Sequence, residues 1–374
     1  MIMVQDLQAH ENAGKNLLYI AQLNKAQDSG VLKKIIGTVD AARKIGLMAD
    51  AEIVEDISYT GWIAVFKLIV NAKVDIIILR SCGIFMFFLI PALFWVRLFS
   101  STKIIIDVPT PIQIFVLESR TRKRAYYKIF FFELLIRLAF PVSLWFAHKV
   151  VQYGEESKYF SLGLKRKMVT LSNGVDVEKV VKRSHVPDVE NGLVLIAVAN
   201  VAIWHGYDRV IRGLANYKRN NANSKMLVRF QIIGEGGAIA GLMALAKALN
   251  VEELVEFKGA RTGKELYDCY NSAHLAVASL ALHRKNIYMA SELKAREYTA
   301  VGIPFIMTAI DSDFKNNVEF VYMERSEDAP IDIDSLVNWY VALEFCDKNI
   351  ASMRNYAINN LDYLAKISKI LSFN

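Results

Sequence analysis

The chain of 374 residues is poor in cysteine and proline, and it lacks the patterns typical of several common protein classes. Its three cysteines, Cys82, Cys269 and Cys346, form no CxxC pair and no metal-ligand spacing. A disulfide framework and a metal site are therefore not expected, and a reducing compartment is favoured. Because the N-terminus has no basic segment followed by an apolar one, we also expect no secretion signal.

Hydrophobic runs long enough to span a bilayer are missing as well. The runs from Ser81 to Val96 and from Leu138 to Ala147 contain no charged residue. Each is shorter than the ~20 apolar residues that a spanning helix needs, and each contains a proline. We therefore expect both runs to be buried against a sheet.

The composition favours a globular protein with an anionic partner. Hydrophobic residues make up 53% of the chain, and the length suggests two domains of ~150 residues each. The formal net charge of +7 favours a partner that carries phosphate groups or an acidic membrane surface. Nucleic acid is not expected, because no nucleic-acid-binding motif accompanies the charge.

Strand-like apolar runs alternate with helical segments in both halves. Such alternation is typical of an α/β fold with parallel sheets covered on both faces. The nine runs that we expect to form strands are 16–21, 75–79, 103–107, 149–152, 193–199, 226–233, 254–258, 275–278 and 305–307. The expected domains are residues 1–170, residues 171–345 and a C-terminal helix, 346–374, that returns to the N-terminal domain.

The stretch from Ser291 to Pro304, SELKAREYTAVGIP, is expected to organise the binding site. It reads as a short helix after the strand 275–278, and such a helix would direct its free N–H groups and its positive dipole end toward a ligand over the strand ends. Lys294 and Glu297 share one helix face and can address one ligand together. A surface helix with an internal ion pair is the alternative interpretation.

A glycine-rich turn follows the strand 226–233. Glycines from Gly234 to Gly237 at a strand-to-helix turn allow backbone amides to approach a phosphate closely. Taken alone this is a weak signal, because a tight turn requires glycine for steric reasons as well.

Five motifs in order carry a family resemblance. They are SNGVD at 172–176, WHGYDR at 204–209, IIGEGG at 232–237, VEFKGA at 255–260 and LKAREYTAVGIP at 293–304. In this order and spacing the chain resembles the GT-B glycosyltransferases of the family 4 type, and among them those that assemble bacterial surface polysaccharides. The resemblance covers the second half nearly throughout and the first half mainly by pattern.

The resemblance implies two Rossmann-like domains that face each other across a cleft, with a nucleotide-sugar held mostly by the C-terminal domain. By motif position, Glu297 would bind the ribose hydroxyls and Arg261 would lie where the base is read. Gly30 would approach the donor when the cleft closes. The residues expected to face the diphosphate are Gly234, Gly236, Leu293 and Lys294.

The chain departs from the family pattern at two places. Met289 stands where the family usually has a glutamate that contacts the donor sugar, and Ser291, Glu292 or His283 are the expected substitutes. Asn200 and His205 stand where the family usually has a pair of cations. Histidine is a weaker cation, and a neighbouring phosphate would favour its charged form.

Arg209, Arg284 and Lys294 are then expected to supply the remaining positive charge. Without the resemblance, His205 would be read as an ordinary half-exposed histidine at a helix start.

The expected function is metal-independent, cofactor-free transfer of a sugar from a nucleoside-diphosphate sugar to a hydroxyl of a saccharide or lipid-linked acceptor. The resemblance implies retention of the anomeric configuration and a cytoplasmic location at the membrane face. No convincing base or nucleophile emerges, and Asp107 and His283 are the cleft candidates. Two alternatives remain open: a nucleotide-sugar epimerase of the same fold, and a membrane-docked saccharide-binding subunit without turnover.

A basic and aromatic segment in the first half suits an anionic membrane surface. Its expected membrane contacts, which precede the tyrosines and phenylalanines of 126–132, are Arg120, Arg122, Lys123 and Arg124. A solvated basic helix start is an equally good interpretation.

Overall fold

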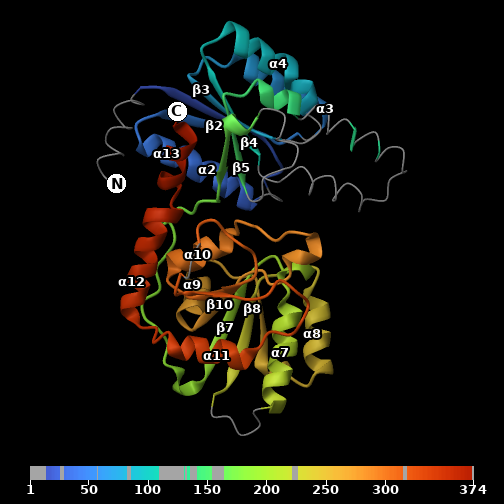
Figure 1. Ribbon diagram of the computed structural model, residues 1–374, viewed down its shortest axis with the longest axis vertical. Coiled ribbons are helices and arrows are strands. Elements are labelled where there is room, and N and C mark those ends of the chain that lie inside the picture. Colours follow the sequence, from blue (N-terminus) through green and yellow to red (C-terminus); the bar gives the residue numbers. More distant parts are fainter. Residues whose placement is uncertain are drawn as a thin grey trace. The chain divides into compact units, whose positions relative to one another are not determined.

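The computed structural model consists of two compact units, each built on its own parallel sheet (Figure 1). The first unit comprises Met1–Gly174 and Tyr363–Asn374, and the second comprises Val175–Asp362. The structure describes residues 14–25, 29–56, 58–81, 86–108, 130, 133–134, 141–153, 164–220, 226–314 and 318–372.

The sheet of the first unit has six strands in the order β2-β1-β3-β4-β5-β6, and every neighbouring pair is parallel. The strands are β1 Asn16–Gln22, β2 Met48–Val54, β3 Ile76–Arg80, β4 Lys103–Val108, β5 Lys149–Tyr153 and β6 Met168–Leu171. Isoleucine and valine fill β3, β4 and β5, which are central and buried on both faces, as expected for strands covered by helices.

Helices cover both faces of this sheet. On one face, α2 (Ser29–Lys44) and α13 (Tyr363–Leu371) pack on the sheet in one hydrophobic core. On the other face, α3 (Tyr59–Asn71) and α4 (Met86–Phe99) form a second core with the alternate side chains of the same strands. Because α13 belongs to this unit, the chain returns at its C-terminal end to the unit in which it began.

The sheet of the second unit also has six parallel strands, in the order β12-β11-β10-β7-β8-β9. The order reverses next to β7, the first strand of this unit, as in the doubly wound sheet of a Rossmann fold. The strands are β7 Leu193–Val198, β8 Val228–Ile233, β9 Val255–Gly259, β10 Leu275–Val277, β11 Phe305–Met307 and β12 Val321–Met323.

Two cores again lie on the two faces of this second sheet. One contains side chains of α7 (Tyr207–Asn220), α8 (Ile239–Ala248) and α11 (Ile333–Ala342). The other contains side chains of α9 (Gly263–Asn271), α10 (Leu293–Val301) and the π-helical turn Ala357–Leu361 that follows α12 (Asp347–Tyr356). The remaining short turns of 3-10 helix are Lys165–Lys167, Val189–Asn191, Ile203–His205, Glu252–Leu254 and Leu282–Lys285.

The predicted fold class is confirmed: two units with parallel, doubly covered sheets. All nine expected strands are present, with ends shifted by up to two residues. The sequence prediction missed β2, β6 and β12, and it joined α12 and α13, which are separate helices. Residues 346–362, expected in the returning helix, belong to the second unit.

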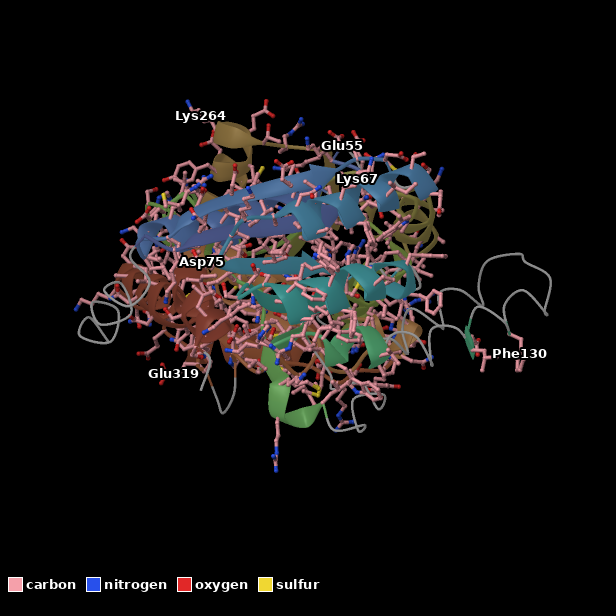
Figure 2. All side chains as sticks on the ribbon, turned by 90° about the horizontal axis from the view of Figure 1, so that it is seen from above. Glu55, Lys67, Asp75, Phe130, Lys264 and Glu319 are labelled. Carbon is pink, nitrogen blue, oxygen red and sulfur yellow. The ribbon has the colours of Figure 1, made fainter. Side chains whose placement is uncertain are left out.

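The expectation that both uncharged runs are buried is only half right. In α4, Met86, Leu89 and Leu93 are buried in the core, but the opposite face of the helix is exposed. In the second run, of which residues 141–147 are described, Leu144 is buried while the side chain of Trp145 is 49% exposed. Figure 2 shows the described side chains on the ribbon.

The ring of Tyr363, the first residue of α13, fits between two glycines of the first unit. A Cβ atom on Gly37 in α2 would lie 2.3 Å from this ring, and one on Gly174 would lie 2.5 Å from its other edge. The two glycines therefore leave the space that α13 occupies, and the ring has little room to move away from either of them.

We predict that Gly37→Ala destabilises the protein although alanine is the better helix former. Overpacking costs about 1–3 kcal/mol, which exceeds the gain in helix propensity of about 1 kcal/mol. At Gly241 in α8, a Cβ atom would have no atom within 4 Å apart from those of its chain neighbours and its own helix backbone, so Gly241→Ala should stabilise. Denaturant midpoints measure both effects, and a second change, Tyr363→Leu, should remove part of the Gly37→Ala penalty. A Gly37→Ala variant as stable as the parent would contradict this packing.

Candidate functional site

The expected donor-binding residues of the second unit lie at one edge of its sheet. Asn200 follows β7, Gly234 and Gly236 follow β8, and Arg261 follows β9. Because the strands are parallel, these loops all lie at the carboxyl ends. The strand order reverses between β7 and β10, which is where open α/β sheets bind ligands.

Lys294 lies at this reversal point, in the first turn of α10. Its Nζ is 3.4 Å from the hydroxyl of Tyr207, the first residue of α7, so the starts of the helices that follow β7 and β10 meet here. Burial lowers the pKa of Lys294 to about 8, although the carboxylate of Glu292 acts in the opposite direction. A half-buried ammonium beside free helix N–H groups is suited to an anionic ligand.

Glu292 is the N-cap residue of α10 and is half-buried. Its Oε2 accepts a hydrogen bond from the backbone N–H of Ser279 at 3.1 Å, while Oε1 is buried and has no hydrogen-bond partner among the described residues. Burial raises the pKa of Glu292, against the lowering effect of Lys294. The carboxylate thus keeps one buried oxygen without a partner among the described residues, two positions before the expected phosphate-binding lysine.

His205 is buried and neutral. Its Nδ1 accepts a hydrogen bond from the backbone N–H of Ala202 at 3.0 Å, so the proton of the neutral ring is on Nε2. The ring stacks on that of Tyr207, with centroids 5.4 Å apart. Burial, assisted by the charge of Lys294, lowers the pKa of His205 to about 3. Without a ligand, His205 therefore supplies a hydrogen-bond donor at this place and no charge.

Glu297 lies one turn further along α10. It is half-buried and its Oε1 accepts a hydrogen bond from the hydroxyl of Tyr270 in α9 at 3.2 Å. One phenol bond leaves most of the acceptor capacity of the carboxylate unused. This arrangement is compatible with the predicted binding of two ribose hydroxyls.

The glycine turn after β8 is required by packing. Gly234 and Gly236 have φ values of +126° and +145°, and a Cβ atom on them would lie 1.8 Å and 2.3 Å from the carbonyl oxygens of Ala199 and Val201. The turn is therefore held tightly against the loop after β7, which carries the exposed Asn200. Close approach of a phosphate to this turn stays a prediction.

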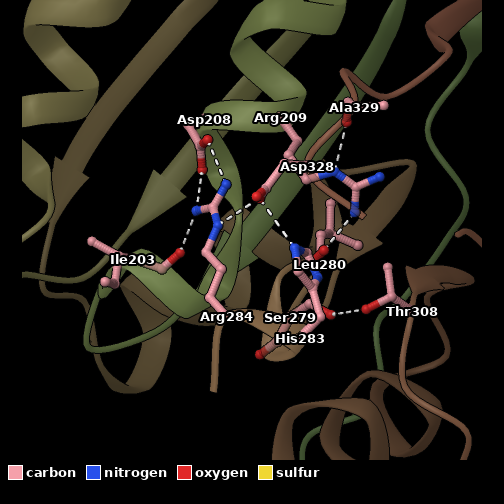
Figure 3. Close-up of polar contacts among 10 residues, drawn as sticks. All are labelled: Ile203, Asp208, Arg209, Ser279, Leu280, His283, Arg284, Thr308, Asp328 and Ala329. Atoms are coloured by element: carbon pink, nitrogen blue, oxygen red, sulfur yellow. Dashed lines mark hydrogen bonds and ion pairs between the residues drawn. The ribbon is translucent and has the colours of Figure 1, made fainter. Parts of the chain in front are cut away.

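Arg209 is fully buried in α7. Its Nε donates to the carbonyl of Ala329 at 2.7 Å, and its Nη1 donates to the carbonyl of Leu280 (Figure 3). Because the guanidinium is enclosed and holds two loops, this placement favours a structural role over the predicted contact with the diphosphate.

Arg284 and His283 belong to one ion-pair network at the Leu282–Lys285 turn (Figure 3). The guanidinium of Arg284 binds both carboxylate oxygens of Asp208, at 2.9 and 2.8 Å, and its Nε binds Asp328 at 2.8 Å. The Nε2 of His283 is 3.1 Å from the same Asp328 oxygen. Two carboxylates therefore already neutralise Arg284, and its charge is less available to a diphosphate than that of Lys294.

Asp107 lies in β4 of the first unit and is only 2% exposed. Its carboxylate accepts a hydrogen bond from the hydroxyl of Tyr19, lies 3.3 Å from Nζ of Lys34, and lies 3.5 Å from Nη1 of Arg80. Burial lowers the pKa of Lys34 to about 8, against the raising effect of Asp107. The carboxylate of Asp107 is therefore the centre of a buried ionic network. This position does not favour its predicted role as a catalytic group.

Three further predicted site residues lie in described parts of the chain. Gly30 lies in the first turn of α2, and Arg261 lies in an exposed loop where Nη1 is 3.7 Å from Glu265. Leu293 is the first residue of α10 and is 39% exposed. The expected membrane contacts Arg120, Arg122, Lys123 and Arg124 lie outside the described residues. Among the described residues, no cluster of histidine, cysteine, aspartate or glutamate has the arrangement of a metal site.

Sequence reasoning overlooked Tyr207 and Tyr270 as members of the site. Both lie in amphipathic helices, where the sequence pattern predicts that a tyrosine on the inward face belongs to the hydrophobic core. Both side chains are indeed buried. Only the pairing of α7 with α10, and of α9 with α10, brings their hydroxyls to Lys294 and Glu297. The Tyr-Asp-Arg sequence after Gly206 was the sole local signal.

Residues 192–329 match the family model described as glycosyl transferases group 1. The second unit carries a glycosyl transferases group 1 domain. The matched segment contains every predicted donor-binding residue of this unit, from Asn200 to Glu297. A search of curated proteins found no match.

Solved structures of glycosyltransferases share the fold of the whole chain. A glycosyltransferase from Rickettsia africae ESF-5 is 13% identical, with a TM-score of 0.63 over 96% of this chain and 97% of that one. Trehalose-6-phosphate synthase OtsA is 9% identical, with a TM-score of 0.61 over 95% and 97%. An alpha-glucosyltransferase solved with UDP and DNA is 12% identical, with a TM-score of 0.57 over 96% and 100%.

At these identities the similarity shows the GT-B fold. The group 1 match over residues 192–329 and this fold together support sugar transfer as the activity of the chain.

We predict that Glu297→Gln weakens binding of the donor nucleotide by about 1.5–3 kcal/mol, the range for a hydrogen bond to a charged group. Isothermal titration calorimetry with a panel of nucleoside diphosphates measures the effect. Glu319→Gln, which changes an exposed carboxylate of the same unit, serves as the control and should bind as the parent does. Unchanged affinity in the Glu297 variant would remove this residue from the site.

The lowered pKa of Lys294 predicts a pH dependence. The lysine is charged below about pH 8 in the free protein, so kcat/KM for the donor should fall as the pH rises above that value. In Lys294→Arg the charge persists, and the fall should disappear up to about pH 10. His205 is neutral on both sides of pH 8, so His205→Asn should leave the position of the fall unchanged. An arginine variant with the parental profile would show that another group titrates.

Proposed function

We propose that the chain transfers a sugar from a nucleoside-diphosphate sugar to a hydroxyl group of a saccharide or lipid-linked acceptor. The observation that carries this proposal is the position of Lys294, whose ammonium lies at the start of α10 beside Tyr207, where the strand order reverses. A cation and free helix N–H groups at this place fit the diphosphate of such a donor. A structural neighbour of the same fold was solved with UDP.

The leaving diphosphate then departs next to charges that are already in place. Lys294 and the N-terminus of α10 stabilise the negative charge that develops on it, and neutral His205 adds its Nε2–H as a donor. The proposal contains no metal and no cofactor, because these protein groups take the electrostatic role. Retention of the anomeric configuration, which the family resemblance implies, is part of the proposal.

Met289 stands in place of the glutamate that usually contacts the donor sugar. Three other side chains were candidates for this contact. His283 lies 3.1 Å from Asp328, and Ser291 has an interaction within the protein. Glu292 has an oxygen without a partner among the described residues and lies two residues before Lys294. We assign to Glu292 the contact with a hydroxyl group of the donor sugar.

The proposed setting is bacterial surface polysaccharide synthesis at the cytoplasmic face of the plasma membrane, with the segment that contains Arg120, Arg122, Lys123 and Arg124 in contact with anionic lipid. The net charge of +7 supports an acidic surface as partner. None of the helices in the described ranges is long and apolar enough to cross a membrane.

Two measurements test the function. Mass spectrometry of the purified protein incubated with a panel of nucleotide-sugars identifies the donor that is retained. With that donor, we expect release of nucleoside diphosphate only when a saccharide acceptor is added, and a product of unchanged anomeric configuration. Because one neighbour was solved with DNA, a DNA duplex is included and should not serve as acceptor.

The possible outcomes separate the alternatives. Conversion of the donor without acceptor would identify an epimerase, and donor binding without turnover would identify a binding subunit. Glu292→Gln should lower the discrimination between donor sugars while the affinity for the free nucleoside diphosphate stays within about twofold of the parent, since a sugar contact is absent there. Loss of nucleotide affinity in this variant would contradict the assigned contact.

A further inference from the structure

The exposed face of α4 is an aromatic surface in the first unit. Its residues, which we call the α4 surface, are Phe87, Phe88, Phe94, Trp95, Leu98 and Phe99, and their exposed fractions lie between 47% and 65%. They recur at helical spacing, so they form one continuous stripe along the helix. The opposite stripe, which includes Met86, Leu89 and Leu93, is buried in the core.

Neighbouring side chains extend this surface. The rings of Trp95 and Phe99 are 4.4 Å apart, and those of Phe94 and Phe146 are 5.7 Å apart. Phe88 meets Tyr59 of α3, a residue that is itself 65% exposed, with 6.4 Å between their rings. Soluble monomers rarely expose contiguous apolar patches of this kind unless a partner covers them.

The charged residues within α3 and α4 are positive. Helices α3 and α4 contain Lys67 and Arg97 and no acidic residue, and Lys67 is exposed (Figure 2). At the C-terminal end of α4, Nη1 of Arg97 lies 2.6 Å from Nε2 of His148. The pKa of His148 falls to about 4 because of burial and the charges of Arg97, Lys167 and Lys103, so three cations surround this ring.

We propose that the α4 surface docks on a bilayer of anionic lipid, with α4 lying in the interface. Phenylalanine, leucine and tryptophan would enter the boundary between headgroups and acyl chains, and the cations at the end of the helix would meet lipid phosphates. Helix α4 has 14 residues and does not span a bilayer. A twofold contact between two copies would bring two identical basic edges together, whereas anionic lipid neutralises them.

This inference deepens the proposed membrane location by naming a surface, and it does not depend on sugar transfer. Lipid binding is measured without donor, and donor binding is measured without lipid. A failure of one measurement therefore leaves the other informative.

The first test is co-sedimentation of the full chain with vesicles of about 70% phosphatidylcholine and about 30% phosphatidylglycerol. The variant Trp95→Ser, Leu98→Ser, Phe99→Ser should bind at least about tenfold more weakly than the parent, because it loses exposed apolar area. The control Met243→Ser, Val341→Ser changes side chains that are 51% and 53% exposed in the second unit and should bind as the parent does. Unchanged donor affinity in both variants shows that they are folded.

Charge is tested separately. Arg97→Gln should weaken vesicle binding about fivefold, the effect of about 1 kcal/mol for one charge near an anionic surface, and high salt or pure phosphatidylcholine vesicles should weaken it further. Equal binding of Arg97→Gln and the parent at low salt would overturn the electrostatic part of the proposal.

Tryptophan quenching by brominated lipids tests contact directly. Vesicles with brominated acyl chains should quench the fluorescence of the parent and of Trp204→Phe, and Trp95→Phe should lose most of this quenching.

The proposal is overturned if the parent does not bind anionic vesicles, or if the triple serine variant binds them equally well. It is also overturned if that variant dissociates a dimer seen by light scattering, which would make the α4 surface a protein interface. Retained binding by the triple variant, together with loss of binding on changing Arg120, Arg122, Lys123 and Arg124 to alanine, would assign docking to that segment instead.

Discussion

The buried ion pair of Arg296 fixes the helix on which the proposed donor site depends. Arg296 is fully buried in α10, and its Nη2 binds Asp311 at 2.7 Å and Asp313 at 2.8 Å in the loop after β11. Because successive helix residues are rotated by about 100°, holding Arg296 in the core sets the directions of Lys294 and Glu297. Breaking such a pair leaves an uncompensated buried charge, so the rotation of α10 has little freedom.

The cations near the donor site divide into two groups according to their partners. Arg209 is enclosed by backbone carbonyls, and Arg284 is neutralised by Asp208 and Asp328, so both hold loops together. Lys294 has a neutral hydroxyl and an aromatic ring beside it, and burial lowers its pKa because the carboxylate of Glu292 offsets the effect only in part. An anionic ligand therefore gains most from Lys294. His205 can stay neutral here because a second charge next to Lys294 would be repelled.

The sequence predicted the two sheets well because their central strands are continuous apolar runs. It missed β2, which is an edge strand whose polar residues Asp50 and Glu52 interrupt the pattern, and it missed the short strands β6 and β12. Motif order placed Glu297 and Lys294 on one helix at the correct edge of the sheet. The burial of Arg209 and Asp107 was not predictable, because a charged residue in a sequence gives no sign of the partners that enclose it.

The same limit applied to α4, where composition alone suggested burial on all sides. A helix that is apolar all round gives no periodic signal, so only the packed structure distinguishes the face on the sheet from the face that is exposed. The two units therefore differ in the kind of ligand that their surfaces suit. The second presents a cation and helix N–H groups, which suit a soluble, charged donor. The first presents aromatic side chains with a basic edge, which suit lipid. A lipid-linked acceptor has both an apolar anchor and a sugar, and an enzyme that rests on the bilayer would meet it at high local concentration.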